Sequence, residues 1–237
     1  VSVSAFDDTV AWYENNGAAD PTWTAADIAT NVDGAEDVRI GDIDFDGDLD
    51  IITVSQNDDT VALFFNDGAK DPSWTKTVVN SEADSVHGVD FADLDGDGDL
   101  DIVSSSWNDN TIAWYENDGA ADPSFNAADI VTNITGAIGI HVDDMDADGD
   151  MDIVIASFND DTIRWYESDG AANPSWSATT ISTELDGAKQ VEVFDLDQDG
   201  DLDILANSMN DDKIAWFEND GAANPSWGNP NIITTSF

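Results

Sequence analysis

The sequence has no cysteine, only six lysines and arginines, and only two histidines among its 237 residues. Without cysteine it forms no disulfide and no thiolate metal site. No apolar run approaches the length of about 18 residues that a membrane-spanning helix needs, so we expect no membrane insertion. The few basic residues stand against 52 aspartates and glutamates, a net charge of −46, which repels phosphate backbones and anionic lipid. We therefore expect no nucleic-acid partner, and cation binding is the first function to consider.

The chain repeats itself without gaps every 51 residues. One glycine marks each period, at Gly17, Gly68, Gly119, Gly170 and Gly221. Repeats of about this length are typical of solenoids, propellers and arrays. With 41% hydrophobic residues the chain has enough apolar side chains for a core, and we expect a single domain over residues 1–237. Its repeats are a partial one at 1–33, followed by 34–84, 85–135, 136–186 and 187–237.

Each repeat predicts four short strands and no helix. In the third repeat the strands are expected at 89–92, 102–106, 111–116 and 125–133, separated by clusters of turn residues. The strand at 111–116 is apolar on both faces, as expected for a sheet that is covered on both sides. The sequence therefore predicts an all-β fold, a β-propeller of four-stranded antiparallel blades. The first repeat begins after the position of its inner strand, so the first blade is expected to lack it.

Four repeats carry the same acidic loop, D-x-D-x-D-G-D-x-D, between the first and second expected strands. Carboxylates at loop positions 1, 3, 5 and 9 can converge on one hard cation, the glycine at position 6 allows a sharp turn, and position 7 can offer its backbone carbonyl. So many carboxylates favour Ca²⁺ over Mg²⁺, with one ion per loop and four in all. The alternative is that the aspartates only solvate a surface loop. The candidate metal residues are Asp42, Asp44, Asp46, Asp48, Asp50, Asp93, Asp95, Asp97, Asp99, Asp101, Asp144, Asp146, Asp148, Asp150, Asp152, Asp195, Asp197, Asp199, Asp201 and Asp203.

This repeated loop, placed between two short strands, resembles the FG-GAP/VCBS-like repeat family, which builds calcium-binding propellers of the integrin α-subunit type. The resemblance implies side-chain ligands at loop positions 1, 3, 5 and 9 and a backbone ligand at position 7. The chain lacks a Phe-Gly dipeptide, so it is similar to the looser VCBS-type branch. That branch occurs in secreted bacterial adhesins, lectins and accessory modules of polysaccharide-degrading enzymes. It implies the fold and the metal firmly and the function only loosely.

The repeats differ mainly at one end of the expected blades. The acidic loops and the Asn-Asp-Gly-Ala-Ala loops should share one end, the calcium-loop end, and the turns between the second and third strands should share the other, the turn end. At the turn end, aromatic and polar residues replace one another from repeat to repeat, which suits a site for a sugar or a peptide. The alternative is that they fill the rim between blades or pair across the channel. The candidate ligand residues are Arg39, Gln56, His87, Trp107, His141, Phe158, Lys189 and Met209.

Most tryptophans occupy repeated positions instead, and we expect them in the core. They are Trp12, Trp23, Trp74, Trp114, Trp165, Trp176, Trp216 and Trp227.

These observations favour a calcium-stabilised, non-catalytic binding or adhesion module that recognises glycans at the turn end. Calcium loops of this kind bind at concentrations that favour an extracellular or cell-surface location, and the resemblance points to a secreted bacterial protein. The alternative is a structural building block of a surface layer, filament or multidomain assembly, with other domains or copies of the chain as partners. A less favoured alternative is a polysaccharide lyase or other carbohydrate-active enzyme, in which His87, His141 or Arg39 would act as base or charge neutraliser. No Ser-His-Asp arrangement is apparent.

The missing inner strand also bears on how the ring closes. A propeller blade without its inner strand leaves unpaired backbone groups at the centre. We expect the chain to be a piece of a longer protein, with a ring of five blades ahead of one of seven. The alternatives are a strand donated by a neighbouring molecule and a larger ring.

Overall fold

The computed structural model describes residues 1–234 and contains five antiparallel sheets, arranged one after another along the chain. The first sheet has three strands and each of the other four has four, and neighbours in sequence are neighbours in the sheet. Within residues 1–234 the chain forms no helix, and hence none long and apolar enough to cross a membrane. The strands are β1 (Ser2–Ser4), β2 (Thr9–Asn15), β3 (Trp23–Ala29), β4 (Ala35–Gly41), β5 (Asp50–Ser55), β6 (Thr60–Asn66), β7 (Trp74–Asn80), β8 (Val86–Ala92), β9 (Asp101–Ser106), β10 (Thr111–Asn117), β11 (Phe125–Thr132), β12 (Ala137–Asp143), β13 (Asp152–Ser157), β14 (Thr162–Ser168), β15 (Trp176–Ser182), β16 (Ala188–Phe194), β17 (Asp203–Ser208), β18 (Lys213–Phe217) and β19 (Asn231–Thr234).

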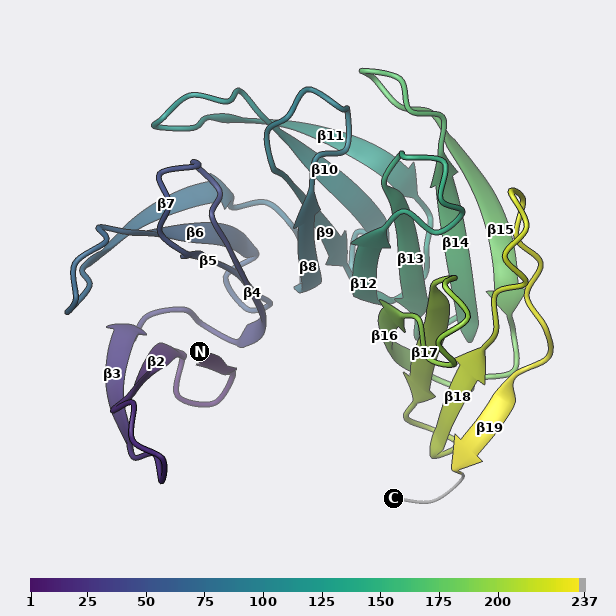
Figure 1. Cartoon of the computed structure of the whole chain (residues 1–237), viewed down its shortest axis with the longest axis horizontal. Coiled ribbons are helices and arrows are strands. Elements are labelled where there is room, and N and C mark those ends of the chain that lie inside the picture. Colours follow the sequence, from purple (N-terminus) through teal and green to yellow (C-terminus); the bar gives the residue numbers. More distant parts are fainter. Residues whose placement is uncertain (235–237) are drawn as a thin grey trace.

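The expected all-β fold of antiparallel sheets is confirmed, including the first sheet without an inner strand. The end of the last repeat, residues 235–237, lies outside the described residues. Figure 1 shows the sheets as an arc, with β4, β8, β12 and β16 on its inner side and the arc open between the first and the last sheet. Closure into a propeller ring therefore stays a prediction.

Hydrophobic clusters fill the spaces between consecutive sheets. One cluster joins the third and fourth sheets through Ile112, Trp114, Ile140 and Ile155, which are at most 5% exposed. All six residues of β5, β9 and β13 are buried, because neighbouring sheets cover both faces of each second strand. This is why small or apolar residues follow one another in these strands instead of alternating with exposed polar ones.

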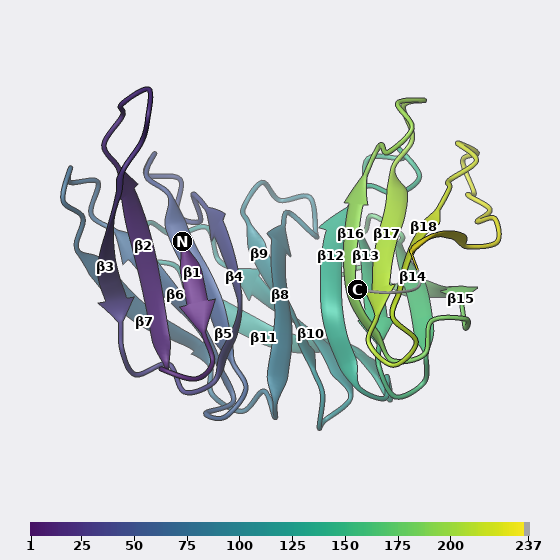
Figure 2. The ribbon, with the colours of Figure 1, turned by 90° about the horizontal axis from the view of Figure 1, so that it is seen from below.

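The two ends of the sheets carry different connections. In Figure 2 the hairpin turn between β1 and β2 lies at the bottom and the loop between β2 and β3 lies at the top. Strand order places every acidic loop at the same end as the loop between third and fourth strands, as expected. The calcium-loop end and the turn end are therefore the two opposite ends of the strands, and each is shared by all the sheets of the arc.

Candidate functional site: acidic loops and an axial pocket

The acidic loops fold around their own carboxylates. In the first loop, Asp42 Oδ2 accepts a hydrogen bond from the backbone N–H of Gly47 at 3.1 Å, which closes the turn. The buried Asp50 accepts from Ile43 N–H and from Asn66 N–H, both at 3.0 Å. The ninth-position aspartate thus ties its loop to the end of the third strand of the same sheet. The same bonds recur in the other three loops.

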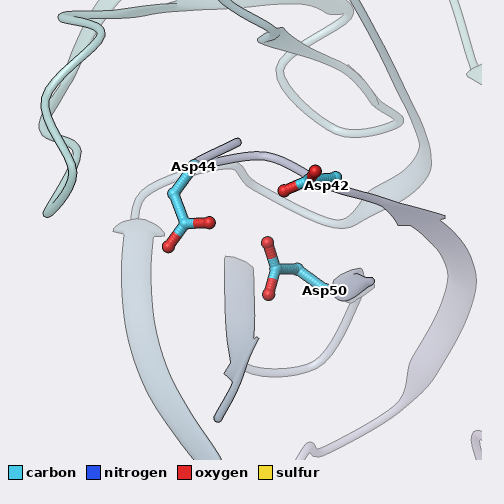
Figure 3. A group of neighbouring side chains, drawn as sticks. All are labelled: Asp42, Asp44 and Asp50. Carbon is cyan, nitrogen blue, oxygen red and sulfur yellow. The ribbon is translucent and has the colours of Figure 1, made fainter. Parts of the chain in front are cut away.

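Carboxylate oxygens converge in each loop as a cation site requires. Figure 3 shows this in the first loop, where the side chains of Asp42, Asp44 and Asp50 point toward a common space. Three carboxylates per loop each place an oxygen within 4.8 Å of the other two. The four groups are Asp42, Asp44 and Asp50; Asp93, Asp95 and Asp97; Asp144, Asp146 and Asp148; and Asp195, Asp197 and Asp199.

Unsatisfied oxygens in two loops fit a bound cation. Asp42 Oδ1 and Asp93 Oδ1 are buried and have no hydrogen-bond partner among the described residues. Burying an anionic oxygen without a donor or a cation is costly. A hard cation coordinated by these oxygens would remove that cost, and an all-oxygen donor set of this kind suits Ca²⁺. The residues present therefore fit a calcium ion.

The pKa values of the loop carboxyls follow from burial. Burial raises the pKa of Asp50 and of Asp101 to about 6 and that of Asp152 to about 7. Burial, with repulsion from neighbouring aspartates, also raises the pKa of the third-position carboxyls Asp44 and Asp95. These groups hold their protons unusually well without a cation, and a nearby positive charge would favour the ionised form.

The seventh-position carboxylates lie elsewhere. A Cβ atom built on Gly68, in the loop between β6 and β7, would meet Asp48 Oδ2 at 2.0 Å. Gly68 also has a φ of +66°, so the carboxylate packs where only glycine leaves room. Asp99, Asp150 and Asp201 pack in the same way against Gly119, Gly170 and Gly221. None of the four belongs to the converging groups, and their predicted role as metal residues stays a prediction.

Asparagine side chains join neighbouring acidic loops. Asn219, just after β18, donates from Nδ2 to the carbonyl oxygens of Leu202 in its own loop and Met145 in the preceding loop, both at 3.0 Å. Asn117 makes the equivalent pair of bonds in the third repeat, at 3.0 and 3.5 Å. The fourth repeat has Ser168 at this position, too short for such a bridge.

A pocket of about 220 Å³ lies at the turn end, near the axis of the arc. One residue near the start of each inner strand contributes to it, together with the residues that follow the second strands of the last three sheets. Five of the eight predicted ligand residues line this pocket. The lining residues are Glu36, His87, Trp107, Ile138, Phe158, Lys189 and Met209.

A backbone irregularity directs the inner-strand residues into this pocket. The pairing register between first and second strands shifts at Glu36, His87 and Lys189 in three sheets and at Ile138 and Gly139 in the fourth sheet. Such β-bulges bend a strand and re-aim a side chain. Glu36 and Ile138 were absent from the predicted site, although they occupy the same repeat position as His87 and Lys189, and that shared position was the available signal.

Two aromatic side chains form the pocket's platform. The rings of Trp107 and Phe158 lie 5.2 Å apart at 43°, and the rings of His87 and Trp107 lie 5.6 Å apart at 34°. The backbone N–H of Trp107 donates to the carbonyl of Ser85 at 2.9 Å, which fixes the turn. His87 Nδ1 lies 2.8 Å from the same carbonyl. Since a carbonyl oxygen only accepts, Nδ1 carries the proton and Nε2 is left for a ligand.

The other three predicted ligand residues lie outside the pocket lining. Gln56 donates from Nε2 to Glu36 Oε1 at 2.5 Å and so supports the pocket indirectly. Arg39 Nε lies 3.4 Å from Asp90, and His141 Nδ1 lies 3.9 Å from Asp90 and 3.7 Å from Glu192. These side chains lie in a row across four neighbouring inner strands, and pairing across the channel was one of the alternatives drawn from the sequence. A role for Arg39 and His141 in ligand binding stays a prediction.

The model of the FG-GAP-like repeat matches residues 46–104 and 144–206, which together make up about half of the chain. The chain belongs to the FG-GAP-like repeat family. This confirms the resemblance drawn from the acidic loops. A comparison with curated proteins gave no match.

Solved structures share the fold of this FG-GAP-like chain at low sequence identity. A lectin from Agrocybe aegerita that specifically recognises non-reducing terminal N-acetylglucosamine is 16% identical, with a TM-score of 0.51 over 97% of this chain and 75% of its own. A protein from Lactobacillus plantarum is 15% identical, with a TM-score of 0.60 over 96% of this chain and 69% of its own. A functionally unknown protein from Desulfotomaculum acetoxidans is 12% identical, with a TM-score of 0.53 over 96% and 78%. At these identities the similarity shows the fold alone.

Proposed function

We propose that this chain is a calcium-stabilised extracellular binding module that recognises saccharides in the axial pocket at the turn end. The observation that carries the proposal is the platform of Trp107 and Phe158 inside a pocket of about 220 Å³. Aromatic faces stack on the apolar face of a sugar ring, while a few polar groups fix its orientation. Glu36, His87 and Lys189 supply those polar groups. The similarity in fold to a lectin supports the class of ligand and not its identity.

Calcium would have a structural role at the opposite end. Each ion would be held by carboxylates of one acidic loop and would offset their mutual repulsion, and binding only to the folded state stabilises it by mass action. In the first loop the ninth-position Asp50 belongs to the converging group and also accepts a hydrogen bond from the end of β6, so an ion there would brace the loop against its own sheet. The need for ambient calcium at about micromolar to millimolar levels supports the extracellular location.

Saccharide binding is tested with a glycan array and with titrations of the best array ligand. The variant Trp107→Ala should abolish binding and leave the melting temperature nearly unchanged. Phe6→Ala is the matched control, because Phe6 is a fully exposed aromatic in the first turn and lies outside the pocket. If Trp107 only packs the rim, Trp107→Ala should retain full affinity and lose about 3–5 kcal/mol of stability, the range for a buried aromatic. That outcome would contradict the proposal, as would an array without any ligand.

A second candidate function is a building block in a larger assembly, and the exposure of the two end sheets favours it. Ile163 and Trp165, in β14, are at most 1% exposed because the fifth sheet covers them. The equivalent Ile214 and Trp216 in β18 are partly exposed, and Trp23 at the start of β3 is 59% exposed. Further repeats of the same kind, in a longer chain or in other molecules, would cover these faces and complete a ring. Native mass measurement tests this candidate: a monomer of 25.4 kDa that binds no apolar dye would count against it.

A further inference from the structure

Lys189 stands out among the few cations of this acidic chain. Arg39, Arg164 and Lys213 form ion pairs with aspartates at 2.7–3.4 Å, and Lys76 lies over the ring of Phe64. Lys189 is exposed, lines the axial pocket and forms no ion pair within residues 1–234. In a chain with 52 acids, a pocket lysine that no carboxylate of the described residues approaches within 4.0 Å is available to an anionic ligand.

The pocket has a carboxylate, that of Glu36, on one side and an ammonium, that of Lys189, on the other. Glu36 comes from β4, where Gln56 holds its Oε1 and leaves Oε2 for a donor such as a sugar hydroxyl. Lys189 comes from β16, with the two inner strands β8 and β12 between it and β4, and offers three N–H donors to an acceptor. The aromatic platform of Trp107 and Phe158 comes from the sheets between them. A ligand that fits all three needs a ring with hydroxyls on one side and an anionic group on the other.

We infer that the pocket prefers a saccharide carrying a carboxylate, such as a uronic acid unit, whose carboxylate binds the ammonium of Lys189. This inference rests on the proposed function and names the ligand class within it. A charge-assisted hydrogen bond to a carboxylate is about twice as strong as a neutral one. The net charge of the chain does not outweigh it, because at about 0.15 M salt charges beyond roughly 8 Å are largely screened.

The test compares three sugars of one linkage by titration calorimetry: a β-linked oligosaccharide of glucose, the corresponding oligosaccharide of glucuronic acid, and its methyl ester. The ester keeps the size of the acid and removes its charge. The acid should bind about tenfold more tightly than the other two. Lys189→Met, which keeps an apolar stem, should abolish this preference. Lys70→Met is the matched control, because Lys70 is an exposed lysine in the loop between β6 and β7 at the opposite end, and it should leave the preference intact.

The outcomes separate this inference from the proposed function. Equal affinity for all three sugars would overturn the preference for a carboxylate and leave saccharide recognition in place. A preference that survives Lys189→Met would also overturn it, because a group other than the ammonium of Lys189 would then bind the carboxylate. Absence of binding to every sugar, here and on the array, would overturn both.

Discussion

The buried ninth-position aspartates should hold the acidic loops together even without calcium, and Asp152 provides the sharpest case. Its carboxylate is 1% exposed and accepts hydrogen bonds from the backbone N–H of Ser168 at 2.9 Å and of Met145 at 3.2 Å. Asp152→Ala would leave two buried donors unsatisfied. Each such donor costs about 1–3 kcal/mol, so the two together cost about 2–6 kcal/mol.

A second effect lowers this figure. Burial raises the pKa of Asp152 to about 7, so the ionised carboxylate is itself unfavourable in the folded chain at pH 8. Removing this unfavourable charge offsets part of the loss in the free energy of unfolding. We therefore expect a loss in the lower half of the range, about 2–4 kcal/mol. The assay is urea denaturation at pH 8 in excess chelator, so that loss of a metal ligand makes no contribution.

The matched control lies two residues away in the same loop. Asp150 directs its carboxylate against Gly170 and accepts no hydrogen bond from a buried backbone group among the described residues. Asp150→Ala should therefore change the free energy of unfolding by about 0.5 kcal/mol or less. Equal losses in the two variants, or a loss below about 1 kcal/mol for Asp152→Ala, would refute the reasoning.

Three further predictions concern the same loops. Gly170→Ala should lower the melting temperature, because its Cβ would lie 1.9 Å from Asp150 Oδ2 at a φ of +61°, and adding Asp150→Ala should restore part of the loss; no recovery would show that the contact is unimportant. Asn219→Ala should destabilise the chain by about 1–3 kcal/mol, because two bonds to the carbonyls of Met145 and Leu202 are lost, and it should weaken calcium binding in a titration; unchanged affinity would argue against communication between loops. Burial raises the pKa of three ninth-position aspartates from 3.8 to about 6 or 7, so the folded chain binds protons more readily than the unfolded one. The melting temperature in chelator should therefore fall as the pH rises from 5 to 7, and saturating calcium should remove that trend. A melting temperature that rises with pH in chelator would contradict the prediction.

Most of the fold could be predicted from the sequence, because the same order of strands and loops recurs in each repeat. The expected strand at 111–116 corresponds to β10, Thr111–Asn117, and the expected strand at 125–133 corresponds to β11, Phe125–Thr132. A strand with apolar residues on both faces predicts a sheet that is covered on both sides, and neighbouring sheets provide that cover here. The core assignment was wrong for Trp23, which is 59% exposed. The equivalent Trp227 contacts Trp165 of the preceding sheet, and no sheet precedes the first one in this chain.

The candidate sites were predictable in part. Spacing alone placed carboxylates of each loop together, but could not show that Asp48 packs against Gly68, since that contact joins two loops distant in sequence. Variation among repeats pointed to Trp107 and Phe158, whose rings are indeed in contact. It could not separate the pocket from the paired charges, because Arg39 lies only three residues beyond Glu36 on β4 and the bulge decides which of them reaches the pocket.

Calcium binding by the acidic loops is the central claim, and counting bound ions tests it most directly. Native mass spectrometry after exhaustive chelation and reloading should show four calcium ions per chain, one for each group of converging aspartates. Asp144→Ala, at the first position of one loop, should reduce the count to three, and chelation should lower the melting temperature well beyond the effect of salt. A chain that retains no calcium and melts at the same temperature with and without chelator would contradict the account.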